Sequence, residues 1–249
     1  MSITTINFGI GGSGTSNYGI AMASKSDIDE MSGGGIDVDA NNQPIPASME
    51  GALTDEKINS MGSFPVDTKL SPNFTIRELC VGNSGNPNHN TKVRNGLPYT
   101  EKEIVIGLRN LAVNVLEPLV KAFGGKNAFT ITSGHRNSNT WKAGAGTSSQ
   151  HFHGQAVDLV FRSGNPVANA TKIAQTLENW SQLIMEYQNS CVIHIGYGNH
   201  SSSIRYNTKE IFSCKGDGRN NIWKNNGLCN ASGKQLVTAP SLGGKNKYA

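Results

Sequence analysis

The sequence predicts an α+β fold in which helices flank a small antiparallel sheet and an extended arm precedes the domain. The first indication is strand patterning: residues 155–161 alternate between two faces, and residues 182–197 contain two β-branched runs separated by turn residues, as in a hairpin. The second is helical spacing of apolar residues over 100–123 and 165–180. The third is the Gly-rich, polar composition of residues 1–67, which can bury too little apolar surface to fold alone.

Charge divides the 249-residue chain at the same place. Residues 1–67 hold nine acidic and two basic side chains, a net charge of −7, whereas the remainder carries +11. A basic domain suits an anionic polymer such as the cell wall, and an acidic arm suits docking to another protein. A solvated surface with a flexible tail explains the same charges.

The N-terminus lacks the basic and apolar regions of a secretory signal, and no run is apolar enough to span a membrane.

Helix starts are marked in the sequence by two capping boxes. Thr75 with Glu78 begins a short helix, and Thr100 with Glu103 begins a longer one that ends at a Gly-Gly pair. Pro118 is expected to kink the last turns of the longer helix, because proline removes a backbone donor and its ring crowds the preceding turn.

Two further segments complete the predicted domain, residues 68–212. Residues 129–132 form a strand that ends at the sequence Ser-Gly-His-Arg, and Asn165 with Pro166 starts a helix whose apolar face needs no functional explanation. Residues 213–249 read as a polar C-terminal extension with Trp223 as its large anchor.

A histidine and a carboxylate lie seven residues apart around a glycine. Asp158 leaves the strand 155–161 on the face of its small neighbours, so a carboxylate points out of an otherwise apolar segment. Such a group needs a cation or donors, and the nearby imidazole of His151 indicates a metal. Gly154 allows the chain to turn so that the two side chains converge.

His194, in the second strand of the hairpin, is the best third ligand. If the hairpin is centred near Ser190, Glu186 lies directly across from His194 and shares its face, beside the metal as a general base. Two histidines and one aspartate, with a fourth position open, form the ligand set of a catalytic zinc ion.

These residues resemble the zinc D-alanyl-D-alanine peptidase family, within the superfamily that contains lysostaphin and Sonic hedgehog. The resemblance covers roughly residues 68 to 200 and rests on an ordered series of motifs. They are Leu70 to Leu79, Val115 to Leu119, Ile131 to Arg136, the pattern Ser149-x-His151-x-x-Gly154-x-Ala156-x-Asp158, and the strand bearing His194.

The resemblance implies a D-Ala-D-Ala peptidase or hedgehog-like fold and a Zn²⁺-dependent peptidase that cleaves stem-peptide or cross-bridge amide bonds of peptidoglycan. It implies that Arg136 positions the substrate, where a guanidinium can bind a carboxylate or peptide oxygen with two donors. Ser149 is similarly implied as a donor to substrate, although a turn-capping serine fits as well. His135 stands where the family usually has tyrosine, and it either orients substrate or fills space.

Three departures from the family pattern concern catalysis. Many relatives carry a glutamate three residues before the last ligand, where this chain has Cys191, so Glu186 is our substitute as general base. Val192 replaces a common tryptophan, and Gly196 stands where a serine is common.

The four cysteines lack Cys-x-x-Cys spacing. Free thiols are the default expectation, and a disulfide between Cys214 and Cys229 is the alternative.

An unsignalled wall peptidase with a docking arm predicts a phage tail protein, made in the host cytoplasm and acting from the virion on the bacterial wall. Residues 1–67 would then contact other virion proteins, and no nucleic-acid partner is expected. The alternatives are a soluble endolysin and a non-catalytic structural or wall-binding virion protein that keeps the fold.

Overall fold

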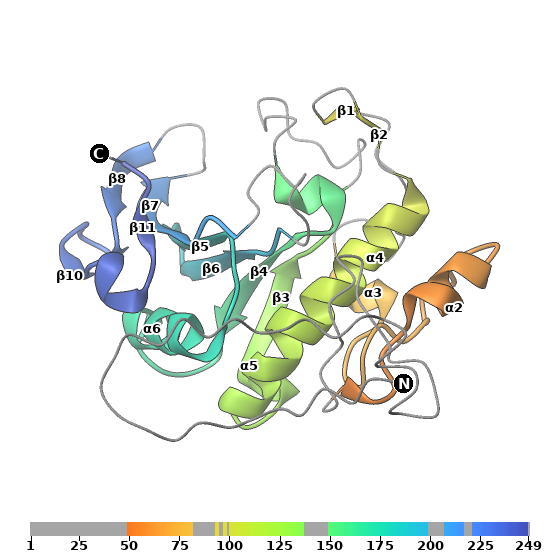
Figure 1. The fold of residues 1–249 in the computed structure, drawn as a ribbon. Coiled ribbons are helices and arrows are strands. Elements are labelled where there is room, and N and C mark those ends of the chain that lie inside the picture. Colours follow the sequence, from red (N-terminus) through yellow and green to blue (C-terminus); the bar gives the residue numbers. More distant parts are fainter. Residues whose placement is uncertain are drawn as a thin grey trace, which may run out of the picture. The chain divides into compact units, whose positions relative to one another are not determined.

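The fold is built on a mixed seven-stranded sheet, seen here in a computed structural model that describes residues 49–81, 93–94, 97–98, 100–136, 149–198, 207–216 and 221–248. The strand order is β11–β7–β5–β6–β4–β3, and β8 also pairs with β7 (Figure 1). The bounds are β3 (Phe129–Ser133), β4 (Ala156–Phe161), β5 (Gln182–Tyr187), β6 (Cys191–Gly196), β7 (Glu210–Gly216), β8 (Asn221–Asn226) and β11 (Lys245–Asn246).

The predicted α+β class is confirmed, but the sheet is larger than predicted and is not purely antiparallel. Strands β3, β4, β6 and β5 pair antiparallel, as the sequence indicates. Strand β7 runs parallel to β5, and β11 runs parallel to β7. The direction follows from the strand order. β7 comes after β6 in the chain but pairs with the other edge of β5, which is antiparallel to β6. Because β7 runs antiparallel to β6, it is parallel to β5.

The two faces of the sheet have different roles because side chains alternate along each strand. One face carries apolar side chains that enter the main core; they are Val157, Leu159, Leu183, Met185, Ile193, Ile195 and Ile211. The opposite face carries Asp158 and His194. The functional residues of the central strands are therefore mounted on a sheet whose reverse side is anchored by close packing.

The long predicted helix consists of α4 (Glu101–Leu111), a π-helical turn η2 (Ala112–Leu116) and α5 (Glu117–Ala122). Thr100 and Glu103 form the predicted capping box. The π-helical turn ends two residues before Pro118, where the missing N–H and the proline ring disturb the regular hydrogen-bond ladder. The sequence predicts a kink here, and the structure shows this irregular turn.

Shorter helices complete the core side of the domain. Helix α3 (Ile76–Leu79) has the predicted capping box of Thr75 and Glu78, and α6 (Pro166–Thr176) begins at Asn165, whose side chain accepts hydrogen bonds from the first turn. Helix α6 packs on β5 and β6 (Figure 1). The 3-10 turn η3 (Lys126–Ala128) leads from α5 into β3.

Residues 49–67, which the sequence analysis assigns to the arm, pack on the domain. They include α2 (Asp55–Ser60), which contacts α4, and Ile58 is fully buried. The buried guanidinium of Arg109 holds this segment through the carbonyl oxygen of Leu53, 2.5 Å away, and the carboxylate of Asp55. These contacts hold residues that composition alone assigns to an extended arm; residues 1–48 lie outside the described residues.

The C-terminal segment is also part of the domain structure, so the predicted boundary at residue 212 falls inside β7. After β8 the chain forms a small antiparallel pair, β9 (Leu228–Cys229) with β10 (Gln235–Val237), then the 3-10 turn η6 (Pro240–Leu242) and β11. Trp223 on β8 contacts the ring of Tyr187 on β5, with centroids 5.9 Å apart. A separate pair, β1 (Val93–Arg94) with β2 (Leu97–Pro98), precedes α4.

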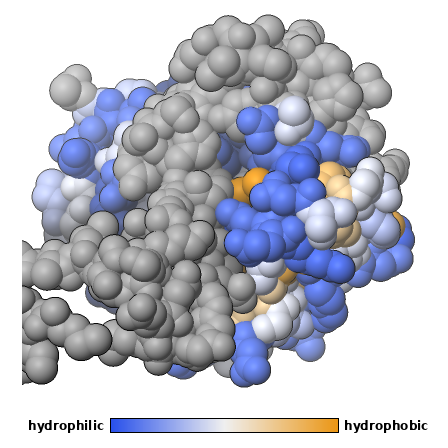
Figure 2. All heavy atoms as spheres, turned by 45° about the vertical axis from the view of Figure 1, so that its right-hand side comes forward, coloured by the Kyte–Doolittle hydropathy of each residue, from blue (hydrophilic) through white to orange (hydrophobic). Residues whose placement is uncertain are grey.

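The surface of the described residues is mostly hydrophilic on the face shown in Figure 2. Among these residues, only Ile222 and Leu236 are large hydrophobic side chains with high exposure. In the described part of the chain, every helix is too short or too polar to cross a bilayer.

Candidate metal centre

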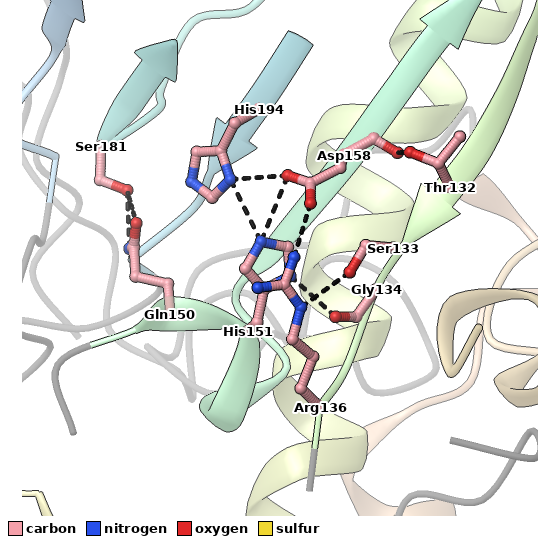
Figure 3. A network of polar contacts seen from close by, with 9 residues as sticks. All are labelled: Thr132, Ser133, Gly134, Arg136, Gln150, His151, Asp158, Ser181 and His194. Carbon is pink, nitrogen blue, oxygen red and sulfur yellow. Dashed lines mark hydrogen bonds and ion pairs between the residues drawn. The ribbon is translucent and has the colours of Figure 1, made fainter. Parts of the chain in front are cut away.

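Three side chains from two strands and a short helix meet at one point on the sheet. Asp158 on β4 lies directly opposite His194 on β6, so both side chains leave the sheet on the same face. His151 comes from the 3-10 helix η5 (Gln150–His153), which precedes β4. His194 Nδ1 lies 2.8 Å from Asp158 Oδ1, and His151 Nε2 lies 3.2 Å from each of these atoms (Figure 3). The fold thus brings together all three residues predicted as metal ligands.

The turn that carries His151 toward the strand depends on Gly154, as the sequence predicts. This residue has φ +64°, a left-handed conformation that favours glycine. A Cβ atom there would also lie 2.6 Å from the carbonyl oxygen of Ile104 on α4. Gly154 therefore serves both the chain reversal and the close packing of η5 on α4.

The geometry and chemistry of the donor set fit a metal ion such as zinc. Tetrahedral Zn²⁺ with bonds of about 2.0–2.1 Å holds its nitrogen and oxygen ligands about 3.3 Å apart. The three donor atoms here are separated by 2.8, 3.2 and 3.2 Å, and all three residues are buried. Two imidazoles and one carboxylate leave a fourth position for water or substrate.

The ionisation of the triad also suits metal binding. Burial is the main cause that lowers the pKa of His151, which favours the neutral imidazole that binds metals. Burial alone would raise the pKa of Asp158, but in the metal-free site the charge and hydrogen bond of a protonated His151, followed by the hydrogen bond from His194, hold it well below its usual value. The aspartate is therefore an anion at neutral pH.

A backbone contact sets the tautomer of His151. Its Nδ1 lies 2.8 Å from the carbonyl oxygen of Gly134, so Nδ1–H donates there and the Nε2 lone pair faces the triad. Gly134 has no room for a side chain, because a Cβ atom would lie 2.0 Å from the carbonyl oxygen of Leu79. The Ser-Gly-His-Arg segment thus orients a metal ligand through its main chain.

Arg136 contacts the triad from the other side of Asp158. Its Nη2 donates to Asp158 Oδ2 at 2.7 Å, and its Nε donates to Ser133 Oγ at 2.8 Å (Figure 3). Its backbone N–H donates to the carbonyl oxygen of His151 at 3.1 Å. The Arg136 side chain is 35% exposed, so the guanidinium both holds the aspartate and remains accessible. Substrate binding by Arg136 stays a prediction.

The other two predicted substrate contacts lie beside His151. His135 is fully buried, and its Nδ1 lies 3.0 Å from the carbonyl oxygen of His151, which makes it a support for the ligand segment. Ser149 precedes η5, where its carbonyl oxygen accepts a hydrogen bond from Phe152 N at 3.2 Å. A substrate contact by either side chain stays a prediction.

The predicted register of Glu186 is wrong by two residues. In the hairpin, Glu186 pairs with Val192, and Ile184 is the residue opposite His194. The turn is centred on Asn189, because Tyr187 already pairs with Cys191. A slip of two residues preserves the face, so Glu186 remains a diagonal neighbour of His194 on the triad side of the sheet.

The surroundings of Glu186 raise its pKa. Burial is the main cause; the charges of His194 and Arg136 act in the opposite direction, and the charge of Asp158 raises the pKa further. A buried carboxylate with a raised pKa, close enough to His194, Asp158 and Arg136 to interact with each, is a candidate general base.

The strand pattern explains why Cys191 cannot take that role. Cys191 packs against the main core together with Ile193 and Ile195, so position 191 faces away from His194 in this regular strand. All four cysteines are free thiols, which agrees with the default expectation and excludes the alternative bridge between Cys214 and Cys229 in this structure.

A polar pair that the sequence analysis missed supports the triad. Gln150, which starts η5, donates from Nε2 to Ser181 Oγ at 2.8 Å, and the serine hydroxyl lies 3.2 Å from Gln150 Oε1 (Figure 3). Both residues are buried. A Cβ atom on Gly196 would lie 2.1 Å from Gln150 Oε1 and 2.9 Å from Ser181 Oγ. Gly196, where the family commonly has a serine, was therefore the feature of the sequence that could have indicated this pair, because a side chain at position 196 would collide with it.

A pocket of about 460 Å³ lies elsewhere, and Asn114, Glu117, Leu177 and Tyr197 are among its lining residues. None of the triad residues lines it. The Glu117 carboxylate is already satisfied by Ser71 and Asn73, so the triad, with its convergent donors, remains the candidate functional site.

Comparison with known protein families identifies part of the chain. Residues 75–196 match the family model described as Peptidase M15. No curated protein and no solved structure matches the chain. The matched segment contains His151, Asp158, His194, Arg136 and Glu186, and it ends before β7 and β8.

Proposed function

We propose that this chain, which contains an M15 metallopeptidase domain with a His-Asp-His metal site, is a zinc-dependent hydrolase of peptidoglycan amide bonds. The observation that carries the proposal is the buried triangle of His151 Nε2, Asp158 Oδ1 and His194 Nδ1, with separations matching one shared ion. The bonds are in the stem peptide or the cross-bridge.

The chemistry divides between the metal and the protein. Bound at the triad, zinc supplies Lewis-acid activation of a water molecule and of the scissile carbonyl. His151, Asp158 and His194 hold the ion, and Arg136 fixes the orientation of Asp158 through its second oxygen. The Gly134 carbonyl keeps the proton of His151 on Nδ1.

Glu186 is the proposed proton carrier. Its position on the triad face and its raised pKa support a carboxylate that accepts the proton of the attacking water and passes it to the leaving amine. Cys191, at the position where many relatives carry glutamate, faces the core and leaves this role open.

The substrate class follows from the family and from charge. The M15 family implies a peptidoglycan substrate. The net charge of +11 outside residues 1–67 supports attraction to an anionic wall polymer. Arg136 and Ser149 are the proposed groups that position the peptide, with His135 behind them.

Digestion of purified peptidoglycan tests the proposal. The wild-type protein loaded with zinc should release peptide fragments whose masses identify the cleaved amide bond. A chelator should stop the release and added zinc should restore it. His151→Ala should bind no zinc and release nothing while keeping its circular dichroism spectrum. Cleavage by a zinc-free His151→Ala protein would contradict the metal-dependent mechanism.

A non-catalytic wall-binding protein is the second candidate, and the absence of glutamate at position 191 favours it. The same digestion separates the two. A folded wild-type protein that binds zinc and sediments with the wall, but releases no fragments, would establish binding without hydrolysis.

The biological context is a separate proposal: the protein is a phage tail component that is made in the host cytoplasm and opens the wall from the virion. The acidic, Gly-rich residues 1–67 support a docking segment for other virion proteins, whereas a soluble endolysin has less need of one. Mass spectrometry of purified particles should detect the chain. Its presence only in the lysate supernatant would favour the endolysin.

A further inference from the structure

We infer that Lys224, on the C-terminal strand β8, binds a free carboxylate of the peptide substrate at the far end of the triad face. This inference rests on the proposed peptidase function and extends it to substrate selection. Lys224 lies beyond the segment that matches the family model, so the match does not assign it a role.

The strand register places Lys224 on the same face of the sheet as the triad. His194 on β6 lies opposite Ile184 on β5, Ile184 is level with Phe212 on β7, and Phe212 pairs with Asn226 on β8. Paired residues of neighbouring strands point to the same side, and so do residues two apart along one strand. Lys224, two residues before Asn226, therefore shares the face of His194.

Side-chain contacts show, independently of the strand register, that these residues share one face of the sheet. Ile184, Phe212 and Cys214 form a small apolar cluster separate from the main core, and Tyr248 packs against it. The rings of Phe212 and Tyr248 meet edge to face with centroids 5.2 Å apart. The ammonium of Lys224 lies over the ring of Tyr248, 6.0 Å from its centroid.

Cys214 lies between Glu186 and Lys224 across the strands, two residues along from the series Ile184, Phe212 and Asn226. Cys214 is level with Glu186 on β5 and pairs with Lys224 on β8. Burial raises the pKa of Cys214 to about 11; the Glu186 carboxylate adds to this increase, and the Lys224 ammonium opposes it. Both charges are therefore close to the thiol. Neighbouring strands are about 4.8 Å apart, which separates the Cα atoms of Glu186 and Lys224 by roughly 10 Å.

The charges on this face leave Lys224 available. Asp158 is paired with Arg136, and Glu210 is paired with Lys247 at 3.0 Å and with the amide of Gln182. Lys224 is exposed and forms no ion pair with any residue that the structure describes. An extended peptide advances about 3.3 Å per residue, so a substrate residue roughly two to four positions from the cleaved bond can reach the lysine.

The occupant is thus a carboxylate on one flank of the cleaved bond, beyond an apolar floor of Ile184, Phe212 and Tyr248. Amidation of that carboxylate removes the charge and should remove the contribution of Lys224. The inference concerns selection between substrates, and it leaves zinc binding and Glu186 unaffected.

The test uses two synthetic peptides that differ only by carboxylate or carboxamide at one residue, in a series that moves this residue along the peptide. The full-length, zinc-loaded wild type should cleave the carboxylate form with a kcat/KM about fivefold higher at one position, the size expected of one exposed ion pair. Lys224→Gln should remove this preference by slowing only the carboxylate peptide, and Lys224→Glu should invert it.

Lys215→Gln is the matched control, because Lys215 is the neighbouring lysine on β7 but pairs with Trp223, whose ring packs on the core side. It should keep the wild-type preference. Zinc content and melting temperature verify that each variant is folded. In the wild type alone, rising salt should reduce the preference for the carboxylate form, which tests the inference without any substitution.

The outcomes separate the inference from the proposed function. A wild type that cleaves no peptide in any series and no peptidoglycan would refute the peptidase function. A wild type that cleaves both forms equally at every position, or a Lys224→Gln protein that keeps the full, salt-sensitive preference, would overturn the role of Lys224 while the peptidase function stands.

Discussion

Replacing Glu186 with glutamine tests the proton carrier at the site. The amide keeps the shape of the side chain on β5 but cannot accept a proton at neutral pH. General-base catalysis typically contributes about 10²–10⁴-fold, so kcat should fall by that factor, equivalent to about 3–5 kcal/mol in the activation barrier. The fold should survive, since the reverse side of β5 remains anchored in the core by Leu183 and Met185.

The same substitution should change zinc affinity only a few-fold. Glu186 is not one of the three residues whose donor atoms converge. The Glu186 carboxylate attracts the positive charges of His194 and Arg136 and repels the negative charge of Asp158, so its electrostatic effects on these groups partly cancel. A chelator competition assay measures the affinity, and hydrolysis of a synthetic peptide measures the rate.

Glu178→Gln provides the control, because Glu178 is an exposed glutamate eight residues earlier in the chain. It should leave both zinc affinity and rate unchanged. An unchanged rate for Glu186→Gln would remove this residue as the base, and a large loss of zinc would mean that it belongs to the metal site.

Three further predictions concern a support of the site, the attachment of residues 49–67 to the domain, and the ionisation of Glu186. Ser181→Ala removes the buried partner of Gln150, the residue before His151, and should weaken zinc binding in chelator competition because the start of η5 loses this anchor; unchanged affinity would contradict a supporting role for the pair. Arg109→Met leaves the Asp55 carboxylate without its buried cation and should lower the free energy of unfolding in urea by about 3–5 kcal/mol, whereas Arg77→Gln, in a solvent-exposed pair, should cost under about 1 kcal/mol. In the metal-free protein, the Glu186 carboxyl should titrate by NMR above the usual range of glutamate, because burial disfavours its charged form. The folding stability contributed by this group is then lost as the pH rises through that pKa. A normal or lowered pKa would contradict a buried Glu186 carboxyl.

The triad could be predicted because each ligand is marked by a local pattern. Asp158 breaks the apolar alternation of its strand, Gly154 marks the turn beside His151, and His194 lies in a β-branched run. Alternation along a strand fixes the face of a side chain, so three residues from separate segments could be assigned to one side of the sheet.

The register of Glu186 could not be predicted, because it depends on the turn. The sequence Gln188-Asn189-Ser190 allows hairpins of different loop length, and the structure uses all three residues as the loop between Tyr187 and Cys191. A hairpin centred one residue later would have placed Glu186 directly opposite His194. The face was predictable because a two-residue slip preserves it.

The contribution of the C-terminal segment was also hidden from sequence analysis. Strand β7 pairs with β5, and this parallel pairing between distant segments has no local signal. Strand β8 carries Trp223 among polar side chains, which is typical of an edge strand but equally of a loop. Likewise, the contact between Arg109 and Asp55 joins residues 54 positions apart, and composition alone assigned the Asp55 segment to the extended arm.

X-ray absorption at the zinc edge of the loaded protein tests the metal centre most directly. One zinc ion per chain should show only nitrogen and oxygen neighbours at about 2.0 Å, with the signature of two imidazoles, and His194→Ala should lose the ion. Sulfur neighbours at about 2.3 Å would place the ion at the cysteines, and either that spectrum or the absence of bound zinc would contradict a site built from His151, Asp158 and His194.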